Sequence, residues 1–244
     1  MPVLEPRSDG VVERVAARVG EGHPVLVFLA TMLTALVLIA GLSILLGFLV
    51  VHVVLHIGGT NAADEQVNDW LAAHRTASRT HLSLIGSIMS GGVVLPVIVG
   101  CIALVSALLR RWRIAAFVVF VLGVESASYR LTTLVIHRHR PTVPRLEGLA
   151  VNASYPSGHT AAAIAVYCGL ALLLSSAIRN TPARVVIWTV AVAIVVLEAA
   201  SRMYRGMHHP LDVGGGVVVG IASVCGLVLA ARAAAAADRG GDAE

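Results

Sequence analysis

The chain has 244 residues, of which 57% are hydrophobic and 13% are charged. A soluble domain of this length cannot bury so much apolar surface, so the composition predicts one integral membrane domain. The formal net charge is +4, and all 18 basic residues are arginines. Most of them lie at the ends of apolar segments and form no surface run. This placement argues against nucleic acid as a partner and is typical of membrane topology.

Six apolar segments, each long enough to cross a bilayer, follow a mixed-charge N-terminal stretch. We expect an all-α polytopic membrane protein with six transmembrane helices, near residues 25–55, 82–109, 113–136, 157–177, 184–204 and 211–232. The domains are then an N-terminal tail (1–23), a six-span domain (24–232) and a C-terminal tail (233–244), whose alanine run we expect to fray. Within the first tail, Val11 to Val19 fit either a short amphipathic helix or a frayed segment.

The stretch between the first two spans carries an apolar stripe. Val67, Trp70, Leu71 and His74 recur at helical spacing. We expect a short helix within 61–79 that lies at the membrane interface with Trp70 as its anchor. A structural connector is the preferred role, and substrate gating is the alternative.

The run Arg110-Arg111-Trp112-Arg113 is the strongest signal for a cytoplasmic loop. With this run inside and six spans, both termini are cytoplasmic. The ends of spans three and five and the starts of spans four and six then face outward. Three short polar blocks lie at those four ends, so we expect them together on the outer face of the cell membrane. In chain order they are Arg140-Pro141, then Pro156 to His159, then Ser201-Arg202 with His208 and Asp212. Polar residues at the membrane edge are costly and usually mark a site.

One polar block is Pro156-Ser157-Gly158-His159, at the start of the fourth span. Serine is a good N-cap for an apolar helix. The backbone N–H groups of Gly158 and His159, together with the helix dipole, would form an anion site. Glycine also lets an oxyanion approach the backbone closely. A plain helix cap would explain the serine but would leave His159 without a role.

In the last block, His208 and Asp212 are four residues apart. This spacing lets the carboxylate reach the imidazole, fix its tautomer and leave the other ring nitrogen free to attack. His209 is the rival for this role because it lies three residues before the same aspartate. Taken alone, such a pair fits a structural hydrogen bond equally well.

Arginines in the first and last blocks supply the positive charge of the expected site. Arg140 and Arg202 offer forked donors for phosphate oxygens. Arg138 would add charge at the rim, and the Ser201 hydroxyl is a further candidate donor. Glu198 lies one helical turn before Arg202 and could hold its guanidinium in place.

Taken together, the blocks resemble the type 2 phosphatidic acid phosphatase superfamily over about residues 60–230. That family carries a lysine, six residues and Arg-Pro; then Pro-Ser-Gly-His; then Ser-Arg, five residues, His, three residues and Asp. The chain matches the second and third blocks in full and the first at Arg140-Pro141. Thr133 stands at the lysine position, where its hydroxyl, or the charge of Arg130 or Arg138, could replace the lysine.

The resemblance implies a six-span helical fold and a phosphatase that needs no metal ion or cofactor. From the matching positions of the family motif, the resemblance implies that His208 is the nucleophile that forms a phosphohistidine and that Asp212 orients it. His159 protonates the leaving oxygen and then activates water. The residues implied to bind the phosphoryl oxygens are Arg140, Ser157, Gly158 and Arg202.

An outward-facing site at helix ends suits a lipid whose phosphate lies at the interface. Polyprenyl diphosphate is the first choice, by family analogy and topology. Phosphatidate and phosphatidylglycerophosphate are the alternatives.

A transporter that binds a phospholipid without hydrolysis is the rival from another class, but binding alone does not require both His159 and His208. A vanadate-binding oxidase is a third hypothesis, and the membrane spans argue against it. The oligomeric state is left open.

Overall fold

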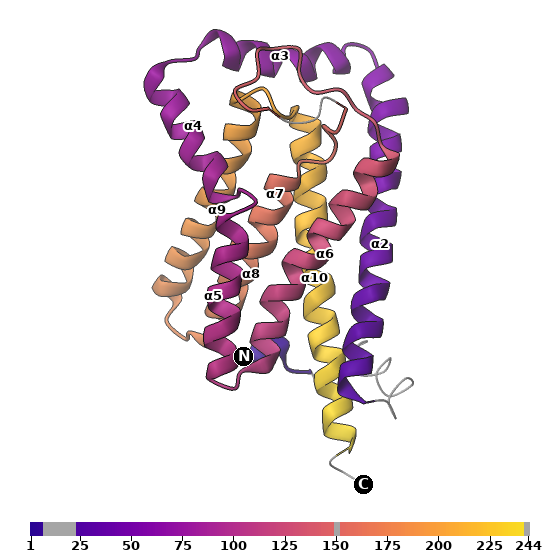
Figure 1. The fold of residues 1–244 in the computed structure, drawn as a ribbon, viewed down its shortest axis with the longest axis vertical. Coiled ribbons are helices and arrows are strands. Elements are labelled where there is room, and N and C mark those ends of the chain that lie inside the picture. The colour runs from indigo at the N-terminus through magenta and orange to yellow at the C-terminus, as the bar shows by residue number, and fades with distance from the viewer. Residues whose placement is uncertain (7–22, 149–151, 242–244) are drawn as a thin grey trace.

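The computed structural model describes residues 1–6, 23–148 and 152–241. Within these residues no strand forms, and a single isolated bridge pairs Arg138 with Ala153. The helices, shown in Figure 1, are η1 (Pro2–Leu4), α2 (Pro24–His52), η2 (Val54–His56), α3 (Thr60–Ala73), α4 (Ala77–Met89), α5 (Val94–Leu108), α6 (Trp112–Val135), α7 (Gly158–Ala163), the π-helical turn η3 (Ile164–Cys168), α8 (Gly169–Ala177), α9 (Thr181–Tyr204) and α10 (Pro210–Gly241).

The spans agree with the sequence prediction except in one place. Helices α2, α6, α9 and α10, and the continuous segment Gly158–Ala177, are each long and apolar enough to cross a membrane. The expected second span is divided into α4 and α5, which meet at a bend of 41°. Gly91 and Gly92 lie in this break, where their low helix propensity favours interruption. Counted as one bent span, the pair completes six, and the chain is an all-α multi-pass membrane protein.

The outer surface of the bundle is apolar. Val37 and Leu38 on α2 and Val185 and Val186 on α9 all expose more than half of their surface. Contiguous apolar surface of this kind is unfavourable in water. It is the surface that acyl chains cover in a bilayer.

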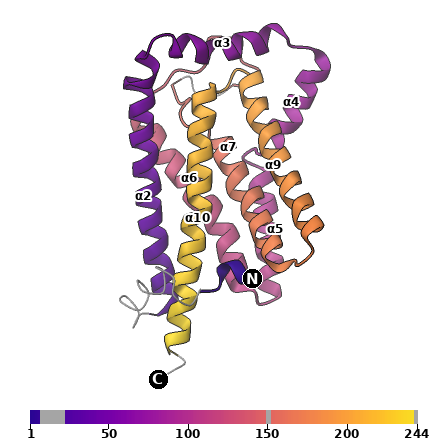
Figure 2. The ribbon, with the colours of Figure 1, turned by 180° about the vertical axis from the view of Figure 1, so that it is seen from behind.

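Helix α10 packs against α2, α6 and α7, and Figure 2 shows it between α2 and α7. Two glycines allow the close approach to α7. A Cβ on Gly216 would lie 2.5 Å from the Ser157 carbonyl oxygen, and one on Gly220 would lie 2.7 Å from the Ala161 carbonyl oxygen. Small residues permit such backbone contact between membrane helices. This packing brings the start of α10 beside the Pro-Ser-Gly-His turn.

The short helix expected within 61–79 is present as α3, with its polar face turned toward the protein. Val67 and Trp70 are exposed, whereas Asp64 and Asn68 are buried. The apolar stripe therefore faces outward, as an interfacial helix requires. The buried polar face contacts the loops that carry the polar blocks.

The C-terminal alanine run does not fray as expected. Helix α10 continues through it to Gly241. Ala233 and Ala237 are buried against Val27 of α2, which explains why this stretch stays helical. The N-terminal segment Val11 to Val19 lies outside the described residues.

All three polar blocks lie at the α3 end of the bundle. Met1 and the C-terminal end of α10 lie at the opposite end, as Figure 1 shows. The blocks therefore share one end, as the topology predicted. Which end faces the cell exterior stays a prediction.

Candidate active site

His208 lies in the turn between α9 and α10 and is buried. Its Nδ1 is 2.7 Å from the Ser154 carbonyl oxygen. A carbonyl oxygen can only accept, so Nδ1 carries the proton and Nε2 holds a lone pair. Nη1 of Arg140 lies 3.4 Å from that Nε2. Burial, followed by the positive charges of Arg202 and Arg140, holds the pKa of His208 well below its usual range, while Asp212 acts in the opposite direction.

Asp212 does not hydrogen-bond to His208 directly, which corrects the expectation from their spacing. Its Oδ2 is 3.9 Å from Nδ1 of His208. The carboxylate instead accepts from Arg138, from the Ser154 hydroxyl at 2.6 Å and from the backbone N–H of His209 at 2.8 Å. Asp212 therefore holds His208 indirectly, because it fixes Ser154, whose carbonyl binds the imidazole.

His209 has both ring nitrogens occupied by carboxylates. Nδ1 lies 3.2 Å from Asp212 and Nε2 lies 2.8 Å from Glu65. A nucleophile needs a free ring nitrogen. The geometry therefore separates the two rivals, since His208 has a nitrogen free of carboxylate partners and His209 does not.

The Pro-Ser-Gly-His block begins α7 as predicted. The Ser157 hydroxyl caps the helix by accepting from the Thr160 N–H at 3.4 Å, and it lies 2.9 Å from the Thr160 hydroxyl. The Ser157 N–H donates to the Asp212 carbonyl oxygen at 2.9 Å, which ties α7 to α10. At Gly158, a Cβ would lie 3.0 Å from the Tyr129 ring, so only glycine fits there without displacing Tyr129. His159 follows in the first turn and is partly buried.

Arg202 is fully buried near the end of α9. Its Nη1 donates to Glu147 at 2.9 Å and to the Ser87 hydroxyl at 2.7 Å. Its Nε and Nη2 have no hydrogen-bond partner among the described residues. Buried donors are almost always satisfied, so this half of the guanidinium is available for an anion.

Glu147, in the loop between α6 and α7, takes the role that we assigned to Glu198. Besides Arg202, its carboxylate accepts from Arg205 at 2.5 Å and from Ser87 at 2.8 Å. Burial opposes its ionisation, but Arg202 and these hydrogen bonds outweigh burial and lower the pKa of Glu147 to about 2. Glu198 forms no ion pair with Arg202 in the described structure. No sequence pattern marks Glu147, because the contact joins residues far apart along the chain.

Three of the expected binding residues have other contacts. Arg138 is buried between Asp64 and Asp212 and is not at the rim. The Ser201 hydroxyl donates to the Leu197 carbonyl oxygen of its own helix at 2.6 Å. The Thr133 hydroxyl likewise donates to the Arg130 carbonyl oxygen at 2.9 Å. Both hydroxyls are therefore used within their helices.

Helix α3 supplies further contacts that the sequence did not indicate. Asp64 accepts from Arg138 and from the Leu211 N–H, and Glu65 accepts from Thr142 and pairs with His209. The Asn68 amide donates at 3.0 Å to the carbonyl oxygens of both Met203 and His208. The polar face of α3 thus holds the turn that carries His208.

Two guanidinium groups and two imidazoles converge at this end of the bundle. Arg140 is buried, and besides His208 it contacts the carbonyl oxygens of Met207 and Ala153. The charges of Arg140 and Arg202 act on both His159 and His208. We call Arg140, His159, Arg202 and His208 the cradle. Such a group can hold a tetrahedral anion beside a ring nitrogen able to attack it.

The fold is that of an integral membrane protein, and the cradle gathers arginines and histidines at one end of its helices. The model of the PAP2 superfamily matches residues 113–235, half of the chain. The chain therefore belongs to the PAP2 superfamily, and it is a membrane lipid phosphatase of the metal-independent kind.

A relative in sequence and a solved structure also resemble the chain. The chain is 27% identical over 191 residues to phosphatidylglycerophosphatase B of Bacillus subtilis (strain 168), covering 73% of this chain and 88% of that protein. The crystal structure of a transmembrane PAP2-type phosphatidylglycerolphosphate phosphatase from Bacillus subtilis matches with a TM-score of 0.64. That match covers 84% of this chain and 94% of the other, at 22% identity, and shows a shared fold.

Proposed function

We propose that the protein hydrolyses the phosphate monoester of phosphatidylglycerophosphate. The name of the Bacillus subtilis relative supports this substrate over polyprenyl diphosphate, the first choice from the sequence. The observation that carries the proposal is the Nε2 lone pair of His208, an imidazole on which the charge of Arg202 acts, together with the N–H groups of Arg202 that have no partner among the described residues. One tetrahedral phosphoryl group fits the donors and the nucleophile that such a cradle offers.

In the first step, Nε2 of His208 attacks phosphorus, and the bond from phosphorus to the ester oxygen breaks. His159 gives its proton to that oxygen, and the lipid alcohol leaves. The Ser154 carbonyl stabilises the proton on Nδ1 while the ring carries the phosphoryl group. Arg140 and Arg202 neutralise the charge on the phosphoryl oxygens.

In the second step, a water molecule attacks the phosphohistidine. His159, now neutral, takes a proton from this water, and the bond between phosphorus and Nε2 breaks. Inorganic phosphate leaves, and the lone pair returns to Nε2. His159 has regained its proton, so both histidines are restored for another turnover.

We further propose that the cradle opens to the cell exterior and that both termini are cytoplasmic. The run Arg110-Arg111-Trp112-Arg113 joins α5 and α6 at the end opposite the cradle. Basic residues in short loops favour the cytoplasmic side. The substrate would then be drawn from the outer leaflet.

The test is phosphate release by purified protein in detergent with EDTA present. Phosphatidylglycerophosphate, phosphatidate and a polyprenyl diphosphate are compared at equal surface concentration. We expect the first to have the highest kcat/KM. A higher value for the polyprenyl diphosphate would restore the earlier choice, and binding of all three without phosphate release would favour the transporter.

His208→Ala tests the nucleophile in the same assay. Loss of the attacking group should lower kcat by roughly 1,000-fold or more, as for other covalent catalysts. His139→Ala is the matched control, because His139 is an exposed histidine in the loop between α6 and α7. Full turnover in His208→Ala would contradict the assignment.

A further inference from the structure

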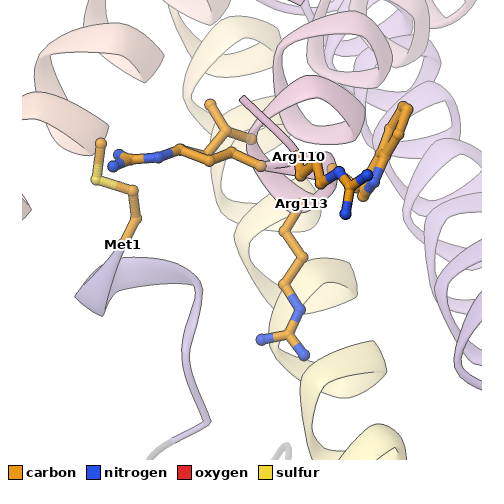
Figure 3. Close-up of a pocket in the computed structure, with 6 residues that line it drawn as sticks. Met1, Arg110 and Arg113 are labelled. Atoms are coloured by element: carbon orange, nitrogen blue, oxygen red, sulfur yellow. The ribbon is translucent and has the colours of Figure 1, made fainter. Parts of the chain in front are cut away.

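The end of the bundle opposite the cradle contains a second polar feature, which we call the basic pocket. It has a volume of about 500 Å³ and is lined by Met1, Ile114 and the run Arg110-Arg111-Trp112-Arg113. Figure 3 shows Met1 on one side of this pocket and the turn with Arg110 and Arg113 on the other. The hydrolytic function gives this pocket no role.

The arginines of the basic pocket differ in their partners. Arg113 forms ion pairs with Glu5 at 3.4 Å and with Asp238 at 2.6 Å. The side chains of Arg110 and Arg111 are exposed and have no hydrogen-bond or ion-pair partner among the described residues. Two positive charges therefore line the pocket without an acidic side chain paired to either of them in the part of the chain that the structure describes.

The backbone of Arg110 gives an independent reason to assign its side chain a role. Helix α5 ends with the Arg110 N–H bonded to the Ala107 carbonyl and the Arg111 N–H bonded to the Ser106 carbonyl, which is a Schellman motif. Arg110 occupies the left-handed position of that motif, with φ of 56°, and it is the only non-glycine residue with positive φ in the described chain. Glycine is the usual residue there, so arginine is kept at a cost in stability.

The start of α6 adds further positive potential. The N-cap residue Arg111 gives no side-chain cap, and the first turn of α6 contains no acidic residue. The first N–H groups of the helix and its dipole therefore favour an anion, which no side chain of this turn supplies.

The pocket also lies where lipid headgroups are found. It joins two spans at their common end, and Trp112 is 65% exposed there, as expected for an aromatic residue at the interface. We propose that the basic pocket binds the phosphate headgroup of an anionic phospholipid in the leaflet opposite the cradle. Arg110 and Arg111 donate to the phosphodiester oxygens, and Trp112 lies against the chains.

The test measures the affinity of the intact protein for phosphatidylserine in phosphatidylcholine nanodiscs by native mass spectrometry. The double variant Arg110→Gly, Arg111→Gln should bind roughly 30-fold more weakly, because each hydrogen bond from an arginine to the lipid phosphate contributes about 1 kcal/mol. The matched control is Arg179→Gln, Arg184→Gln, which removes the same charge from the α8–α9 turn at the same end of the bundle. The control should keep the wild-type affinity.

Arg110→Gly alone separates a lipid contact from a structural role. In phosphatidylcholine it should raise the unfolding temperature, because glycine relieves the left-handed backbone, and it should still weaken phosphatidylserine binding. Equal affinity in wild type and the double variant would overturn the proposal, as would equal losses in both double variants. Stabilisation by inorganic phosphate that is lost in the double variant to the same extent as stabilisation by the lipid would also overturn it, because phosphate binding at the cradle is common to both proteins. Phosphatase activity in neutral lipid should be unchanged in every variant. Loss of lipid binding at the basic pocket is therefore measured independently of hydrolysis at the cradle.

Discussion

Two adjacent histidines at the start of α10 differ completely in their surroundings. His209 is held at both nitrogens by carboxylates, whereas Nδ1 of His208 donates to a carbonyl oxygen and its Nε2 has no carboxylate partner. The spacing to Asp212 suits either residue, so the sequence alone could not separate them by geometry. The difference arises from Glu65 and Ser154, which come from distant segments. Choice of the nucleophile thus depends on long-range contacts.

The environment of His208 predicts an unusual pH dependence. Burial and the charges of Arg202 and Arg140 disfavour the imidazolium, so the folded-state pKa lies below the ordinary value of 6.5. The neutral nucleophile therefore persists as the pH falls below 6.5. The acid limb of kcat/KM should have its midpoint well under that value. A midpoint at or above 6.5 in a pH-rate profile would contradict this.

Replacement of Glu147 tests the contact that fixes Arg202. Glu147→Gln leaves the buried guanidinium without its counter-charge, so kcat/KM should fall about tenfold and stability by about 1–2 kcal/mol. The control is Glu5→Gln, which removes an exposed ion pair at the other end. An increase in activity would mean that Glu147 blocks the cradle instead of positioning Arg202.

The Glu147 carboxylate should also make the free energy of unfolding depend on pH. Its folded pKa of about 2 lies below the ordinary 4.5, so its contribution is present above pH 4.5 and is lost as the pH falls toward 2. The stability difference between wild type and Glu147→Gln should shrink over this window in denaturant titrations. A difference that stays constant with pH would show that the ionised carboxylate is not the source.

Helix α3 shows what a sequence pattern can predict about an element and what it cannot. The apolar stripe with Val67 and Trp70 predicted a short helix, and the structure contains it as α3. The functional contacts come from the opposite face, where Asp64 and Asn68 are buried against the site. Periodicity identifies an apolar face, but it gives no partner for a polar one. A connector that also positions the His208 turn describes α3 better than a connector alone.

The contact of α10 with α7 can be tested with two neighbouring glycines. Gly216→Ala places a Cβ 2.5 Å from the Ser157 carbonyl oxygen and must displace the Pro-Ser-Gly-His turn. We expect a loss of about 1–3 kcal/mol in stability and a fall in kcat. Gly214→Ala is the control, because its Cβ would meet no atom within 4 Å. Equal behaviour of the two variants would show that the close approach is unimportant.

At the scale of the whole molecule, hydropathy and arginine placement predicted the six spans and the gathering of the polar blocks at one end. These properties follow from the bilayer, which constrains the length and composition of every span. The bend between α4 and α5 and the length of α10 were not predicted. The bend follows from the low helix propensity of Gly91 and Gly92, and the length of α10 follows from packing at Ala233 and Ala237.

The orientation of the molecule can be measured with one cysteine at each end. In a background with Cys101, Cys168 and Cys225 replaced, His139→Cys lies at the cradle end and Arg179→Cys at the opposite end. A membrane-impermeant maleimide applied to intact cells should label the first and not the second. The reverse pattern would place the cradle in the cytoplasm.

The most direct measurement is rapid-quench trapping of the phosphoryl group from phosphate-labelled phosphatidylglycerophosphate, followed by peptide mapping. The Nε2 lone pair of His208 predicts a phosphohistidine at residue 208 that forms and decays at the rate of turnover and is absent in His208→Ala. Label on His209, or full turnover with no labelled histidine, would contradict the account.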